Sequence, residues 1–217
     1  MSDPVRSYWE LRLAETRDAL EANNFEAFIV QNGAEARKFV LETLHPALQP
    51  ASVSFSGSGS IADTGLYEAY MKMENIQVLD TWDKNLAWAE KYELRRQALL
   101  VDLFLMGCNA VTEDGLLVNL DMIGNRVGAL TFGPRNVVVV AGRNKIVPDV
   151  ESAMTRIKNF AAPVNTQRLN MKTPCVKTGR CMDCKSPERI CNTWTITEKS
   201  FPAGRVKVVL VNEELGF

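Results

Sequence analysis

The residues best suited to chemistry in this sequence are four cysteines within the segment TPCVKTGRCMDCKSPERIC, residues 173–191. They are Cys175, Cys181, Cys184 and Cys191, in the spacing C-x5-C-x2-C-x6-C. A Cys-x-x-Cys pair can direct two thiolates at one metal centre, and two more nearby thiolates complete four-fold ligation. Lysine and arginine residues between the cysteines favour the thiolate form. The segment therefore predicts that the four cysteines hold a metal centre.

The spacing favours a [4Fe–4S] cluster, and zinc is the alternative. Structural zinc sites usually contain two tight Cys-x-x-Cys pairs, whereas this segment contains one. A cluster is larger than a single ion and tolerates wider gaps between its ligands. Thiols without a metal, or a redox disulfide, are a third interpretation. The fifth cysteine, Cys108, begins an apolar run and is expected in the core, with a thiol in a ligand pocket as the alternative.

A second candidate site is the turn SGSGS at 56–60, which follows a predicted strand and leads into a predicted helix. The backbone N–H groups around Gly59 and the hydroxyl groups of Ser58 and Ser60 can point at an anion near the positive end of the helix. The alternative is an ordinary strand-to-helix connection in which Ser60 caps the helix.

Polar residues also gather at the expected strand ends within 107–149. Asn125, Arg126 and Lys145 lie near glycines at strand–helix junctions, where a cation can reach a bound anion. Ligands of open α/β sheets bind outside the carboxyl ends of the strands. We therefore predict that these residues and the SGSGS turn form one anion site. Glu113, beside an expected hairpin turn, is the candidate catalytic carboxylate.

The order of predicted elements indicates an α/β fold. Strands are expected at 26–32, 51–55, 76–80, 108–111, 116–121, 136–142, 193–197 and 205–217. Helices are expected at 33–48, 61–73, 83–105 and 149–162, after an amino-terminal helix capped at Ser2 and Asp3. Alternating strands and helices predict a largely parallel sheet flanked by helices. One domain is expected over residues 1–217, with a cysteine-rich loop at 171–192 as an insertion.

The composition is that of an ordinary soluble protein and excludes some partners. The chain of 217 residues has 25 basic and 26 acidic residues, and its net charge is -1. This balance argues against binding to nucleic acid or to an anionic membrane surface. No apolar run has the length of a membrane-spanning helix or resembles a signal peptide, so a cytoplasmic location is expected. In that reducing compartment, the cysteines are expected to bind metal or do redox work.

The stretch NAVTEDGLLVNLDMIGNRVGALTFGPRNVVVVAGRNKIVPD at 109–149 resembles the lactate-utilisation (LUD) domain family. AAPVN at 161–165 and VNEELGF at 211–217 extend the resemblance over most of the chain. The resemblance implies a role in the oxidation of lactate to pyruvate, alongside iron–sulfur subunits. It also implies a fold similar to the ribose-5-phosphate isomerase and CoA-transferase superfamily, in which the SGSGS turn stands where a phosphate-binding loop would be.

The sequence departs from the isomerases of that superfamily. Asn109 stands where an acidic residue is expected, and Asn125 and Arg126 interrupt the glycine-rich segment. We therefore expect a lactate-utilisation-type protein that binds or acts on a small organic anion. The alternatives are an electron-transfer or scaffold subunit of a redox complex, and a CoA-transferase-like or isomerase-like enzyme. The expected partners are a small organic anion and redox subunits, and a homo-oligomer is left open.

Overall fold

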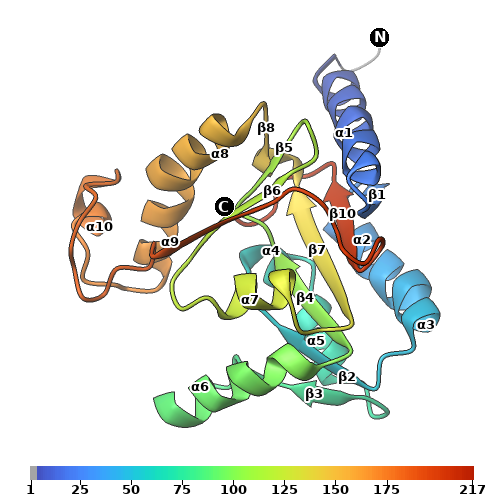
Figure 1. Ribbon diagram of the computed structural model, residues 1–217, viewed down its shortest axis with the longest axis horizontal. Coiled ribbons are helices and arrows are strands. Elements are labelled where there is room, and N and C mark those ends of the chain that lie inside the picture. The colour runs from blue at the N-terminus through green and yellow to red at the C-terminus, as the bar shows by residue number, and fades with distance from the viewer. Residues whose placement is uncertain (1–3) are drawn as a thin grey trace.

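The computed structural model describes residues 4–217 and has an α/β architecture (Figure 1). A six-stranded sheet lies between helices, and a second sheet of four strands packs beside it. The expected parallel sheet flanked by helices is therefore confirmed. The expected cap at Ser2 and Asp3 lies outside the described residues. Within 4–217, no helix combines the length and apolar character needed to span a bilayer.

The six-stranded sheet is parallel throughout. Its order is β1 (Glu26–Val30), β10 (Val206–Val211), β7 (Asn136–Gly142), β4 (Leu103–Gly107), β2 (Ser52–Phe55) and β3 (Gln77–Leu79). Every neighbouring pair runs in the same direction. All six carboxyl ends therefore meet at one edge of the sheet, which is where ligands of such sheets bind.

Strand β7 shows how the sheet is buried on both faces. Val137 and Val139 pack into one core cluster, and Val138 and Val140 pack into the other, because successive side chains of a strand point to opposite faces. The first face is covered by α1 (Pro4–Ala22), η2 (Ala98–Leu100) and α7 (Asn125–Thr131). The second is covered by α2 (Gly33–Phe39), η1 (Val40–Leu44), α3 (His45–Leu48), α4 (Gly59–Asp63) and α5 (Leu66–Met71).

The second sheet has the order β8 (Ile146–Val147), β5 (Ala110–Thr112), β6 (Leu117–Asp121) and β9 (Thr193–Thr197). The expected hairpin between β5 and β6 is present and antiparallel. Ala153 and Ile157 pack on this sheet from a nearly continuous helical stretch, which comprises α8 (Val150–Arg156), η4 (Ile157–Ala161) and α9 (Ala162–Arg168). The cysteine segment, with the short α10 (Cys175–Thr178), projects beyond α9 (Figure 1).

One expected element is wrong, and the last strand is much shorter than expected. The helix predicted over 83–105 is instead α6 (Trp88–Gln97), the turn η2 and then strand β4. All five residues of β4 are buried in the middle of the sheet, and a short apolar run of this kind cannot be told from a buried helix by its pattern. The last strand ends at Val211 instead of 217, because the following residues cross the edge of the sheet.

Candidate functional site

A cavity of about 410 Å³, which we call the edge pocket, lies at the carboxyl edge of the six-stranded sheet. The segments that follow five of the six strands line it. They are Gly57, Ser58 and Gly59 after β2, Thr81 and Trp82 after β3, Gly107, Cys108 and Asn109 at the end of β4, Lys145 after β7, and Phe217 after β10. The parallel topology thus gathers residues from distant parts of the sequence at one place.

The other walls of the edge pocket come from the second sheet and from helices. The end of β6 and the start of α7 contribute Leu120, Asp121, Met122, Ile123, Asn125 and Arg126. Helix α6 contributes Trp88 and Arg95, and α9 with the residues after it contributes Asn165, Arg168, Leu169 and Met171. Ile190 and Cys191 of the cysteine segment complete the wall. The pocket is therefore a mixed surface of arginines, amides and apolar side chains.

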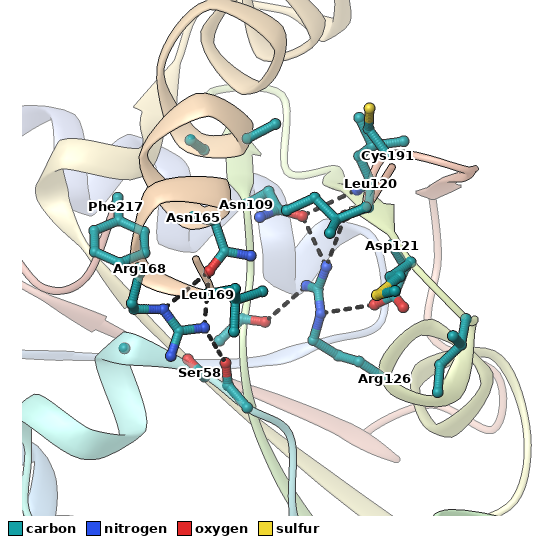
Figure 2. A pocket seen from close by; sticks show the side chains of 18 of the residues that line it. Ser58, Asn109, Leu120, Asp121, Arg126, Asn165, Arg168, Leu169, Cys191 and Phe217 are labelled. Atoms are coloured by element: carbon teal, nitrogen blue, oxygen red, sulfur yellow. Dashed lines mark hydrogen bonds and ion pairs between the residues drawn. The ribbon is translucent and has the colours of Figure 1, made fainter. Parts of the chain in front are cut away.

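Arg126 joins the two sheets at the edge pocket (Figure 2). Its guanidinium donates to Asp121 Oδ2, Gly107 O, Asn119 Oδ1, Asn109 Oδ1 and Leu120 O. The ion pair with Asp121 is 3.0 Å long, and only 14% of the Arg126 side chain is exposed. A guanidinium has five N–H groups. All five of them are directed at protein oxygens, so Arg126 has no free N–H group for a ligand in this arrangement.

Arg95 is the pocket cation with the fewest partners. Its guanidinium lies over the ring of Trp88, 5.4 Å from the ring centroid. Within residues 4–217 it donates no hydrogen bond and forms no ion pair at salt-bridge distance. Burial lowers the pKa of Arg95, which is opposed by the charge of Asp121. An arginine stays charged even so, and a half-buried guanidinium whose N–H groups donate no hydrogen bond favours an anion beside it.

Arg168 of α9 is a second cation on the pocket wall (Figure 2). Its Nε and Nη2 donate to Asn165 Oδ1 at 3.0 and 2.8 Å, and Nη2 also reaches Gly57 O at 3.3 Å. The guanidinium lies 5.8 Å from the centroid of the Phe217 ring. These hydrogen bonds orient Arg168, and within residues 4–217 its Nη1 donates none.

Only 3% of the surface of Lys145 is exposed, yet this residue lines the pocket. Its Nζ donates to Ser60 Oγ at 2.6 Å. Burial lowers the pKa of Lys145 to about 8, and the charges of Arg156 and Arg126 act in the same direction. Cys108 and Asp63 act in the opposite direction. The amine is thus neutral far more often than that of a surface lysine.

The structure brings most of the residues predicted for the anion site together. Ser58, Gly59, Asn125, Arg126 and Lys145 all line the edge pocket. Ser60 is fully buried and accepts a hydrogen bond from Lys145. The N-cap residue of α4 is Ser58.

Glu113 is placed elsewhere, since it forms an ion pair with Arg12 of α1 and is absent from the pocket wall. Cys108 meets both descriptions offered for it, because it is buried and also lines the pocket. Burial raises the pKa of its thiol, which donates to Ala110 O at 2.8 Å. Sequence reasoning missed Arg95 and Arg168, which lie on helices; the one available signal was AAPVN, which includes Asn165.

The four cysteines of the loop all line a second, small cavity of about 20 Å³, which we call the cysteine pocket. All four are free thiols. Cys175 Sγ is in hydrogen-bond contact with Thr166 and Thr173, and Cys181 Sγ accepts from the N–H of Asp183. Arg189 ties the loop together by donating to Cys184 O at 2.6 Å and Cys191 O at 2.9 Å.

The donor chemistry of the cysteine pocket fits a thiolate-ligated centre, but the side chains do not form one as they stand. Within the described part of the chain, no group of three or more Cys, His, Asp or Glu side chains is arranged to hold a metal ion. The metal centre therefore stays a prediction. The two pockets share Ala162, Ile190 and Cys191 as a common wall, so they are direct neighbours.

A sequence model of the LUD domain matches residues 13–211. The chain belongs to the LUD domain family. The matched LUD region includes both sheets and the cysteine segment. No curated protein matches the chain.

Among solved structures, the chain is similar to a DUF162 family protein from Deinococcus radiodurans, with a TM-score of 0.50 and 20% sequence identity. The match covers 94% of this chain and 98% of the other. At this identity the similarity shows a shared fold and no shared activity.

Proposed function

We propose that this LUD domain protein is of the lactate-utilisation type and binds a small organic anion in the edge pocket. The observation that carries the proposal is Arg95, a half-buried guanidinium on the pocket wall that donates no hydrogen bond within residues 4–217. The family relationship favours a 2-hydroxy or 2-oxo carboxylate such as lactate or pyruvate. Such a ligand offers two carboxylate oxygens to the planar fork of an arginine.

The rest of the pocket suits the same ligand class. Arg168 Nη1 offers a second positive donor, and Ser58 and Asn125 offer neutral hydrogen bonds. Trp82 and Leu169 supply apolar surface that excludes water and strengthens these contacts. The volume of about 410 Å³ lies at the lower end of the range for ligand pockets, which suits a small molecule with some bound water.

Replacing Arg95 tests this proposal, and its neighbour on α6 provides the control. Arg95→Gln should weaken the binding of pyruvate or lactate by about 10-fold or more, because a charge-assisted hydrogen bond is worth ~1.5–3 kcal/mol. Arg96→Gln removes the same charge from an exposed position, where Arg96 pairs with Glu93, and should leave the affinity unchanged. Isothermal titration calorimetry measures both. Equal losses in the two variants, or no carboxylate binding by the unmodified chain, would contradict the proposal.

For the cysteine pocket we propose one metal centre ligated by Cys175, Cys181, Cys184 and Cys191, a [4Fe–4S] cluster in preference to zinc. Support comes from the four thiols lining one cavity, and from a spacing with a single Cys-x-x-Cys pair and wide flanking gaps, which suits a cluster. A bound cluster would supply one-electron transfer beside the ligand pocket. The common wall is also what favours the second candidate function, an electron-transfer subunit with redox partners. Reduced thiols of this kind suit the cytoplasm.

The metal proposal is tested on protein prepared without oxygen. The chain should contain iron and show broad visible absorbance, which Cys184→Ala should lose and Cys108→Ala should keep. Cys108 is the matched control because it is the one cysteine outside the loop. If the protein contains zinc instead of iron, bound by the same four residues, then the centre is a zinc site and not a cluster. Iron and zinc both absent from protein never exposed to air would refute either form of the metal centre.

A further inference from the structure

We propose that Lys145 is a nucleophile, whose amine forms an imine with the carbonyl carbon of a 2-oxo acid held in the edge pocket. This inference rests on the proposed function, because it requires that the pocket binds such an acid. It assigns Lys145 a covalent role, which differs from that of a positive charge attracting an anion.

The geometry around Lys145 is unusual for a buried lysine. Its hydrogen-bond partner is the neutral hydroxyl of Ser60, and it forms no ion pair with a carboxylate among residues 4–217. Lys207, which is also buried, shows the usual arrangement, since its Nζ lies 3.6 Å from Glu26 Oε1 and donates to Asn136 Oδ1. A buried ammonium without a carboxylate is costly, so the neutral amine is favoured at Lys145.

Burial is the largest cause of the lowered pKa of Lys145, and the charges around it act in both directions. Arg126 and Arg156 repel the ammonium form, whereas Cys108 and Asp63 favour it more weakly than burial opposes it. With its pKa at about 8, roughly a tenth of the amine is neutral at pH 7, against less than about 0.1% for an ordinary lysine. The neutral amine is the form that attacks a carbonyl group. Lys145 is the pocket residue in which burial, missing counter-charge and access to the ligand cavity coincide.

The reaction is balanced without an oxidant or a reductant. The lone pair of Nζ forms a bond to the carbonyl carbon, and the π electrons of the carbonyl pass to its oxygen, which takes up a proton. The carbinolamine then loses its hydroxyl group as water, and the nitrogen gives up its protons to form the imine. One amine and one ketone thus become one imine and one water. Arg95 and Arg168 hold the carboxylate, and Ser60 Oγ orients the amine by its 2.6 Å contact.

Reductive trapping tests the inference on the full chain. The protein is incubated with pyruvate and sodium borohydride, and the modified residue is identified by peptide mass mapping. One adduct on Lys145 is expected, with none from lactate, which has no carbonyl group. The trapping rate should rise with pH through about pH 8, as the amine loses its proton. Mapping on the unmodified chain needs no variant, so it decides the question even where a variant fails to fold.

A matched pair of variants sharpens the result. Lys145→Arg keeps the positive charge but cannot form an imine, so the adduct should disappear. Lys207→Arg makes the same change at a buried lysine outside the pocket, and the adduct should remain. No adduct, or adducts spread over several lysines, overturns the inference. Calorimetry with pyruvate then separates the two proposals: binding without an adduct leaves the proposed function standing, and absence of binding removes both.

Discussion

At the scale of single residues, three arginines of the edge pocket differ in how many of their N–H groups are already used. Arg126 directs all five at protein oxygens, Arg168 uses part of its set, and Arg95 uses none within the described chain. The same side chain can therefore be a structural link, an oriented contact or a free ligand group. The number of N–H groups that already donate to protein oxygens distinguishes these roles, which the sequence alone cannot do.

Arg126→Met is expected to destabilise the fold strongly. It leaves Asp121 as a buried carboxylate without its cation, a change that typically costs about 3–5 kcal/mol in the free energy of unfolding. Arg135→Met is the control, because Arg135 is 82% exposed in its ion pair with Asp102 and should cost less than about 1 kcal/mol. Chemical denaturation measures both. A stable Arg126→Met variant that has lost anion binding would instead support the anion-binding role predicted for Arg126 from the sequence.

At the scale of elements, the end of β4 and the turn before α4 are packed too closely for a side chain between them. A Cβ atom at Gly107 would overlap Ser58 Oγ and lie 3.3 Å from Ser60 Oγ. The glycine therefore lets the SGSGS turn approach the sheet and sets the floor of the edge pocket. Glycine is needed at position 107 for close packing and not for backbone conformation, since its φ is not in the left-handed region.

Gly107→Ala is expected to displace Ser58, to lower the free energy of unfolding by ~1–3 kcal/mol and to weaken anion binding. Gly57→Ala changes the same turn at a position where an added Cβ atom meets nothing within 4 Å. That variant should keep its stability within error. Thermal unfolding and calorimetry on the pair test the point, and a Gly107→Ala variant as stable and as tight-binding as Gly57→Ala would refute it.

Particular elements show which parts of the fold and of the site could be predicted from the sequence. NVVVVAG predicted β7 at both ends, because a continuous apolar run between polar residues suits a strand buried on both faces. β4 was missed because a single polar residue, Asp102, separates its apolar residues from those that follow the preceding helix. Ser58, Asn125 and Lys145 could be grouped in advance, since carboxyl ends of parallel strands meet. Arg95 and Arg168 could not, because tertiary packing decides which helix faces reach that edge.

At the scale of the whole molecule, the edge pocket and the cysteine pocket are neighbours that different parts of the fold build. The carboxyl edge of the parallel sheet contributes to the first, and the segment between α9 and β9, packed against α9, forms the second. Cys191 lines both, whereas Cys181 lines only the cysteine pocket. A larger side chain at position 191 should therefore change the shape of both pockets.

The pair Cys191→Phe and Cys181→Phe tests this coupling in metal-free protein. The larger side chain at position 191 should protrude into the edge pocket and weaken pyruvate binding by about 5-fold or more, which corresponds to ~1 kcal/mol of overpacking. The same change at position 181 should leave pyruvate affinity unchanged. Calorimetry gives both values. Equal effects at the two positions would mean that the loop influences the edge pocket only through folding.

The hydrogen bonds of Arg126 also limit how this protein can change by mutation. Asn109 Oδ1 accepts from Arg126 and from Leu120 N, and Asn119 Oδ1 accepts from Arg126 and from Asn109 N. Asp121 supplies the counter-charge. Losing one member leaves buried polar groups without partners, so single replacements pass through a less stable intermediate. In aligned sequences of relatives, we expect these four positions to be retained together or exchanged together. Such covariation would record the cost of a buried network in evolutionary history.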